Sequence, residues 1–350
     1  MESSSFEQLK DLRGPILITG HSGFKGTWLT LLLQSMGIEV VGAALKPKKD
    51  SLFNSIYDES DSNLGNWIDL RNSTELANFL GDKKPSYVFH LAAQAIVTEG
   101  YQDPIGTFET NVMGTANLME AIRESNSVKG ITVVTTDKVY KNRNLSNRFV
   151  EDDALEGIDP YSASKVGTEA VATAWKNIYQ KDKEIAVNVV RAGNVIGGGD
   201  LSVNRLLPDL VRSVNSGTPA VIRNPESTRP WQHVLDPLLG YLMAADLSLK
   251  EKKNLTLNFG PIEGALSVSE VARISRQKWN EISFEIQPSG EIYESKYLEL
   301  NSALACDLTG WRPRVNQVEA VGMTIDWWKR RIIGQQSSRE LCMRDIDALC

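Results

Sequence analysis

Short apolar runs alternate with longer amphipathic segments through the first half of the chain. The runs PILITG, EVVGAAL, SYVFHLAA and GITVV are rich in aliphatic side chains, and the segments between them carry apolar residues three or four positions apart. Strands that are apolar on both faces and are separated by helices are typical of a parallel sheet covered on both sides. The pattern therefore predicts a doubly wound α/β fold of the Rossmann type.

The pattern changes after about residue 197, where glycine, proline and arginine interrupt short elements. LTLNFG, at residues 255–260, predicts one further strand of the same sheet, and short helical patterns follow it. We expect a dinucleotide-binding domain over residues 1–196, to which the strand near 255–260 returns. Residues 197–350 are expected to form mainly a smaller substrate-binding subdomain with C-terminal helices, of which TIDWWKRRI is predicted to be a surface helix.

Composition narrows the class of protein. The 350 residues are 41% hydrophobic, which allows one large domain or two closely packed ones, and the net charge of -6 with scattered lysines and arginines argues against nucleic-acid binding. The polar start MESSSFEQLK is not typical of a signal peptide, and no apolar run reaches the ~18 residues of a membrane span. Three cysteines without metal-ligand spacing predict a cytoplasmic protein that holds no structural metal.

Three glycines, Gly20, Gly23 and Gly26, fall between the first strand and the first long helix, in TGHSGFKG. Glycine permits a tight turn and a close approach of the backbone to a pyrophosphate, which the helix N-terminus attracts. The same residues could form an ordinary turn, but their place in an α/β chain favours dinucleotide binding. The second strand ends in GAALKPKK and lacks the usual acidic residue for the ribose. NAD is the expected cofactor, and NADP is the less favoured alternative that these lysines leave open.

Tyr161 and Lys165 are four residues apart in YSASK, so they share one face of a helix. A phenol titrates near pH 10 and is a poor base at neutrality, but a neighbouring ammonium stabilises the phenolate. An ordinary helix with a surface lysine has the same spacing. Downstream of the glycine turn, however, the pair predicts a tyrosine that takes the proton of an alcohol while hydride leaves its carbon.

Thr136, Asp137 and Lys138 directly follow the strand GITVV, in TTDKVY. An acid beside a base at a strand end is either a solvated end of the strand or a group that handles protons. The row lies at the carboxyl edge of the predicted sheet, where open α/β folds bind their ligands. This position favours a catalytic role.

Several segments together resemble, in order, the extended short-chain dehydrogenase/reductases that act on nucleotide sugars, especially their 4,6-dehydratase branch: ILITGHSGFKGTWL, HLAAQ, TNVMGTANLMEA, TTDKVY, YSASK, RAGNVIGGGD, RPWQHV and GWRPR. The resemblance extends over about residues 16–330. It implies bound NAD, a substrate such as CDP-glucose, its conversion to CDP-4-keto-6-deoxyglucose, and a homodimer or homotetramer. The chain departs from the family pattern in AIVTEGY, which lacks the usual arginine and serine, and at Glu294, where histidine is usual.

The resemblance also implies catalytic roles for Thr136, Asp137 and Lys138, which are called the catalytic row below. Thr136 would bind the sugar C4 oxygen, Asp137 would protonate the departing C6 hydroxyl, and Lys138 would act at C5 as a base or as an electrostatic stabiliser of the enolate. An epimerase does not need an acid and a base after the threonine, so the row favours dehydration. A dehydratase for another nucleotide, an epimerase and an inactive NAD-binding scaffold remain the alternatives.

Further residues are expected to bind the two ligands. The cofactor-binding residues are predicted to be Gly20, His21, Gly23, Phe24, Lys25, Gly26, Asp69, Leu70, Leu91, Ala92, Ala93, Thr110, Tyr161 and Lys165. The substrate-binding residues are predicted to be Gln94, Asn111, Asn194, Arg205, Arg223, Arg229 and His233. Arginine suits bidentate phosphate binding, although each arginine could instead form a surface ion pair.

Overall fold

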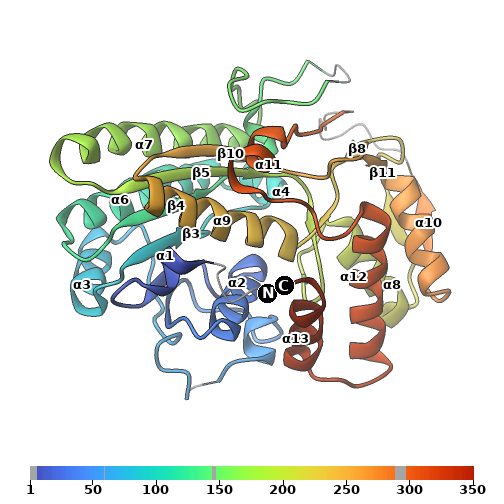
Figure 1. Cartoon of the computed structure of the whole chain (residues 1–350). Coiled ribbons are helices and arrows are strands. Elements are labelled where there is room, and N and C mark those ends of the chain that lie inside the picture. Colours follow the sequence, from blue (N-terminus) through green and yellow to red (C-terminus); the bar gives the residue numbers. More distant parts are fainter. Residues whose placement is uncertain (1–5, 59, 144–146, 288–296) are drawn as a thin grey trace.

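A six-stranded parallel sheet forms the centre of the computed structural model, which describes residues 6–58, 60–143, 147–287 and 297–350 (Figure 1). The strand order is β10-β5-β4-β3-β1-β2. The strands are β1 (Ile16–Thr19), β2 (Val40–Ala43), β3 (Tyr87–His90), β4 (Gly130–Val134), β5 (Ala186–Ala192) and β10 (Leu255–Phe259). All of their pairings are parallel, which confirms the doubly wound α/β prediction.

Alternate residues of β1 to β5 enter two separate hydrophobic cores, whereas β10 contributes Leu255, Leu257 and Phe259 to only one of them. Ile16 and Ile18 of β1 face one core, whereas Leu17 faces the other, as expected from the two-residue period of a strand. The first core includes α2 (Phe24–Ser35) and α9 (Leu235–Glu251), and the second includes α3 (Ser73–Lys83), α6 (Gly114–Glu124) and α7 (Pro160–Asp182). Burial on both faces explains why the strands are continuous apolar runs.

The helical segment over residues 104–124 contains a change of helical type. It comprises α5 (Pro104–Phe108), a π-helical turn η2 (Glu109–Met113) and α6. The remaining elements of the first two hundred residues are α1 (Glu7–Lys10), η1 (Phe53–Ser55), α4 (Val97–Gln102), η3 (Asp137–Val139) and β6 (Val195–Ile196). The π-turn carries the buried Asn111, and π-turns occur frequently next to functional sites.

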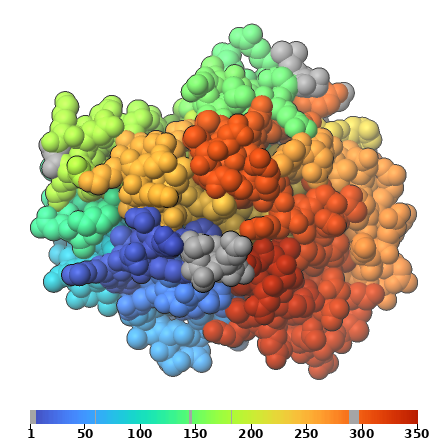
Figure 2. All heavy atoms as spheres, viewed as in Figure 1, coloured from blue at the N-terminus to red at the C-terminus, as the bar shows by residue number. Residues whose placement is uncertain are grey.

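The later part of the chain adds short strand pairs and helices beside the sheet. Its elements are α8 (Leu206–Ser216), β7 (Ala220–Ile222), β8 (Thr228–Arg229), β9 (Gln232–His233), β11 (Leu266–Ser267), α10 (Val268–Lys278), β12 (Phe284–Ile286), α11 (Ala303–Thr309), α12 (Gln317–Ile332) and α13 (Ser338–Leu349). α13 packs on α2, and Figure 2 shows the red C-terminal residues adjoining the blue N-terminal part on that face. The boundary near residue 196 stays a prediction.

The expectation of a surface helix at TIDWWKRRI is wrong in one respect. The segment does belong to a helix, α12, but Trp327 and Trp328 are 1% and 8% exposed. Trp327 fills the space above Gly198, where a Cβ atom would lie only 1.9 Å from its ring. One face of α12 is therefore part of the core, whereas Val318, Glu319, Lys329 and Arg330 of the same helix are exposed.

Candidate active site

The carboxyl ends of the central strands open into a cavity of about 1500 Å³. Residues that directly follow β1, β3, β4 and β5 line it, together with the start of α7 and the segments around Arg205 and Arg223. The strand order reverses between β1 and β3, and open α/β sheets bind their ligands at such a point. Among the described residues, no helix is long and apolar enough to cross a membrane, and no group of three metal-ligating side chains occurs.

The glycine turn packs too closely for any other residue. Gly20 has φ of 75°, and a Cβ atom there would lie 2.7 Å from the backbone of Ala92. A Cβ atom on Gly26 would lie 2.1 Å from the carbonyl oxygen of Gly20. These contacts bring the first turn of α2 down to the end of β1, and the exposed Gly23 faces the cavity. The turn therefore fits the diphosphate of a dinucleotide, which the helix N-terminus attracts.

All but one of the predicted cofactor-binding residues line this cavity. Asp69 accepts two hydrogen bonds from the Arg71 guanidinium, and this pairing holds the pKa of the Asp69 carboxyl below its usual range. The exception is His21, whose Nε2 atom lies 2.8 Å from the Leu64 carbonyl oxygen and whose ring stacks on Trp67. Burial lowers the pKa of His21 to about 4, so the imidazole is neutral and part of the packing.

Thr136 and Asp137 of the predicted catalytic row are buried, so the row is not a solvated strand end. Thr136 and Asp137 are 7% and 1% exposed, and Lys138 is half-buried. The Thr136 hydroxyl donates to Asp137 Oδ1 over 3.0 Å, while Asp137 Oδ2 has no hydrogen-bond partner among the described residues. Burial raises the pKa of the Asp137 carboxyl, against the opposing charge of Lys138. A carboxyl with a raised pKa keeps its proton to higher pH than an exposed one, which suits a general acid.

Tyr161 and Lys165 lie beside this row on the first turns of α7, which begins with a capping box at Asp159. Both side chains are buried, and Lys165 Nζ donates to the Val134 carbonyl oxygen over 3.1 Å. Burial lowers the pKa of Lys165 to about 8 and raises that of Tyr161 to about 12. The Thr136 hydroxyl and the charge of Arg205 act against the rise at Tyr161, because both favour the phenolate.

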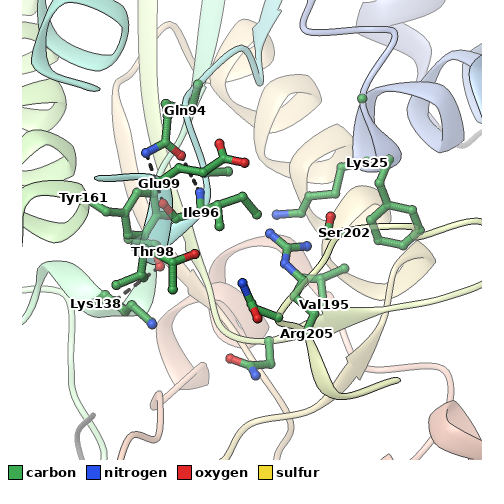
Figure 3. Close-up of a pocket in the computed structure, with 18 of the residues that line it drawn as sticks. Lys25, Gln94, Ile96, Thr98, Glu99, Lys138, Tyr161, Val195, Ser202 and Arg205 are labelled. Atoms are coloured by element: carbon green, nitrogen blue, oxygen red, sulfur yellow. Dashed lines mark hydrogen bonds between the residues drawn. The ribbon is translucent and has the colours of Figure 1, made fainter. Parts of the chain in front are cut away.

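Cationic and amide side chains face the catalytic row from the other segments that line the cavity. Figure 3 shows Tyr161, Thr98 and Lys138 gathered on one side of the cavity and Lys25 and Arg205 on another. Arg205 pairs with Asp200 over 3.2 Å. The other predicted substrate-binding residues on the cavity wall are Gln94, Asn194, Arg223 and Arg229. The arrangement places positive charge where a nucleotide diphosphate could lie.

Two predicted substrate-binding residues do not line the cavity. Asn111 is 1% exposed and donates to the Ser164 hydroxyl and to the Gln94 carbonyl oxygen, so it supports the cavity wall. His233 is fully buried against Trp28, and its Nε2 atom lies 3.8 Å from Asp345 of α13. The departure at Glu294 lies outside the described residues.

Other cavity residues were not anticipated from the sequence. Thr98 and Glu99 of α4 line the cavity, and they belong to AIVTEGY, the segment that departs from the family pattern. Thr135, which precedes the catalytic row, donates its hydroxyl to Glu169 Oε1 over 2.7 Å. Glu169 is four residues beyond Lys165, so the spacing places it on the same face of α7, but no local pattern marks it as buried.

The glycine turn, the buried tyrosine–lysine pair and the ligand-sized cavity together define a dinucleotide-dependent enzyme of the Rossmann type. The model of the NAD dependent epimerase/dehydratase family matches residues 16–260, and the chain belongs to this family. This membership confirms the resemblance identified from the sequence motifs.

Individual relatives agree with this membership. The chain is 38% identical to CDP-glucose 4,6-dehydratase of Salmonella typhimurium, over 93% of this chain and 94% of the relative. It is 24% identical to dTDP-glucose 4,6-dehydratase of the same organism, over 89% and 92% of the two chains. Among solved structures, MoeE5 in complex with UDP-glucuronic acid and NAD has a TM-score of 0.77, is 26% identical, and is matched over 91% of this chain and 100% of its own.

Proposed function

We propose that this protein is an NAD-dependent nucleotide-sugar 4,6-dehydratase that converts CDP-glucose to CDP-4-keto-6-deoxyglucose and water. The observation that carries the proposal is the buried carboxyl of Asp137, which lies beside Thr136 and Tyr161 and has an oxygen without a hydrogen-bond partner among the described residues. An enzyme that only oxidises an alcohol has no use for a second proton donor at this place. The similarity to CDP-glucose 4,6-dehydratase over nearly the whole chain supports the same conclusion.

The glycine turn and the residues after β3 fit NAD, as the close backbone contacts at Gly20 and Gly26 indicate. When it is bound, NAD supplies the acceptor for hydride at C4 and the donor for its return to C6. Tyr161 takes the proton of the C4 hydroxyl, and Thr136 holds the C4 oxygen by a hydrogen bond. Lys165 contributes a positive charge near the phenolate, which favours removal of that proton.

Elimination of water needs an acid at C6 and the loss of the proton at C5. The C4 ketone acidifies C5, so loss of the C5 proton gives an enolate, and loss of the C6 oxygen from it forms a C5–C6 double bond. A proton returns to C5 when hydride reaches C6, which completes the product. Asp137 gives its proton to the departing hydroxyl, which leaves as water. Lys138, which lines the cavity next to Asp137, acts at C5 as the base or as a charge that stabilises the enolate.

Binding of the nucleotide part of the substrate is assigned to the later part of the chain, within residues 197–350. We assign the diphosphate and nucleoside to Arg205, Arg223 and Arg229, because all three line the cavity and guanidinium groups bind phosphate in a bidentate manner. Gln94 and Asn194 are amide groups at strand ends and are placed to bind sugar hydroxyls.

The proposal is tested by side-by-side turnover of CDP-, dTDP-, UDP- and GDP-glucose by the purified protein. We expect CDP-glucose to have a kcat/KM at least ~10-fold above the others, because polar groups built for one base are left unpaired by another. Product should form without a stoichiometric oxidant. A clear preference for another base would overturn the substrate and leave the dehydratase proposal in place.

Two outcomes of the same assay would overturn the dehydratase itself. A sugar recovered with inverted configuration and its C6 hydroxyl intact identifies an epimerase. Bound NAD without turnover of any of the four substrates identifies an inactive scaffold.

We also propose that the protein is a homodimer or homotetramer in the cytoplasm. Exposed apolar side chains cluster on α5 and η2, where Ile105 is 73% and Met113 is 55% exposed, with Phe108 between them. An apolar patch of this kind is typical of an interface. Light scattering is expected to give a mass of two or four chains, and a monomer at micromolar concentration contradicts the proposal.

All three cysteines are free, as expected in a reducing compartment such as the cytoplasm. Recovery of the protein in a periplasmic or secreted fraction would contradict this location.

A further inference from the structure

A buried ion pair lies directly behind the catalytic row. Glu169 of α7 and Arg191 of β5 are 5% and 4% exposed, and the guanidinium donates to both carboxylate oxygens, over 2.9 Å from Nε and 2.5 Å from Nη2. The third hydrogen bond to this carboxylate comes from the hydroxyl of Thr135, over 2.7 Å. One carboxylate thus joins α7, β5 and the end of β4, where the catalytic row begins.

The arginine is held in one position by its other contacts. Its Nη1 atom donates to the Tyr140 hydroxyl over 2.7 Å and to the Glu151 carbonyl oxygen over 2.8 Å. Tyr140 in turn donates to Asn258 Oδ1 over 2.7 Å, and the guanidinium lies over the tyrosine ring, 4.9 Å from its centroid. Because every one of these groups has a partner, the Glu169 carboxylate has little freedom to move.

The helix that bears the catalytic tyrosine is tied to β4 at two successive turns. Lys165 bonds to the carbonyl oxygen of Val134, and Glu169 bonds to the side chain of the next residue, Thr135. Tyr161, Lys165 and Glu169 follow one another at intervals of four residues, so they share one face of α7. The two bonds therefore fix the distance between Tyr161 and the row that follows Thr135.

Stability alone is a weak explanation for this arrangement. Burying two charges costs about as much as their attraction returns, and apolar residues of similar volume often replace such pairs without loss of stability. The pair instead lies where a small displacement matters most, since misplacing a reacting group by about 1 Å can cost about 100-fold in rate.

We propose that Glu169 is a positioning residue for the dehydration: anchored by Arg191, it holds Thr135 and thereby sets Thr136 and Asp137 against Tyr161. The inference rests on the proposed function. Glu169 also faces Lys165 and raises its pKa against the effect of burial, so the same carboxylate helps to keep the catalytic lysine charged.

The hydrogen bond between Thr135 and Glu169 is tested by Thr135→Val, which removes the hydroxyl and keeps the branched shape. We expect kcat to fall about 10-fold or more, with KM and the NAD dissociation constant within threefold of the wild type. Thr135→Ser retains the hydroxyl and should restore at least half of the wild-type kcat. The matched control is Thr132→Val in the same strand, which loses the buried hydrogen bond to the Tyr87 hydroxyl, 2.9 Å away, and should leave kcat unchanged.

A double-mutant cycle with Glu169→Gln tests whether the two residues act together. If the Glu169 carboxylate acts through Thr135, losing the Thr135 hydroxyl has no further effect once the carboxylate is gone. The kcat of the double variant Thr135→Val/Glu169→Gln should then lie within twofold of the kcat of Glu169→Gln. Additive losses overturn the inference. The inference is also overturned if the Thr135→Val variant keeps the wild-type kcat, or if its affinity for NAD falls in proportion to its kcat. If Glu169→Gln does not fold, the comparison of Thr135→Val, Thr135→Ser and Thr132→Val decides alone. These outcomes leave the proposed function standing, whereas a wild-type chain that dehydrates no nucleotide sugar overturns both.

Discussion

Tyr161→Phe is expected to abolish both oxidation at C4 and formation of the ketosugar. In the proposed mechanism the Tyr161 phenolate accepts the C4 hydroxyl proton, and phenylalanine retains the ring without the oxygen. Loss of a general base typically costs about 10²–10⁴-fold in rate. Rapid mixing of the variant with NAD and CDP-glucose should therefore show neither absorbance of the reduced cofactor nor product.

A matched control separates this effect from damage to α7. Tyr179 lies on the same helix, is fully buried, and donates to the Met119 carbonyl oxygen. Tyr179→Phe removes a buried hydroxyl in the same way and should cost about 1 kcal/mol of folding free energy while kcat remains near the wild-type value. Wild-type turnover by Tyr161→Phe would contradict the role of this tyrosine.

Asp137→Asn is expected to stop the reaction at a later stage. Tyr161 and Thr136 remain in place, so oxidation at C4 should proceed, but an amide cannot protonate the departing C6 hydroxyl. Product formation should fall about 10²–10⁴-fold. The variant should fold, because burial already favours the uncharged form of this side chain and asparagine is uncharged and of nearly the same size.

Asp236→Asn is the matched control for Asp137→Asn. Asp236 is also 1% exposed, also has an oxygen without a partner among the described residues, and has its pKa raised to about 7 by burial. It lies on α9, away from the cavity. Asp236→Asn should therefore retain wild-type kinetics, and a loss of activity equal to that of Asp137→Asn would indicate a general effect of buried asparagine.

The sequence predicts the sheet and the glycine turn because local rules determine both. Apolar strands separated by helices allow few arrangements other than a parallel sheet, and Gly20 and Gly26 lie where backbone segments come within contact distance. The spacing of Tyr161 and Lys165 is similarly a property of one helix.

Side chains whose surroundings come from distant segments were harder to predict. His233 belongs to RPWQHV, a motif of the resemblance, but α13 covers it, and no local pattern shows where a C-terminal helix docks. Trp327 and Trp328 appear in a basic, exposed-looking segment and nevertheless join the core. Glu169 became recognisable only when its contacts with β4 and β5 were known, because a glutamate on a helix is most often solvated.

The central claim, that buried Asp137 makes this protein a dehydratase, is tested most directly by a single turnover of Asp137→Asn with CDP-glucose. Absorbance reports the reduced cofactor, and chemical quenching reports the 4-keto-6-deoxy product. If Asp137 is the acid that protonates the C6 hydroxyl, the reduced cofactor accumulates on the variant at a rate near that of the wild type, while product appears at least about 100-fold more slowly. Wild-type formation of product without accumulated reduced cofactor would contradict it.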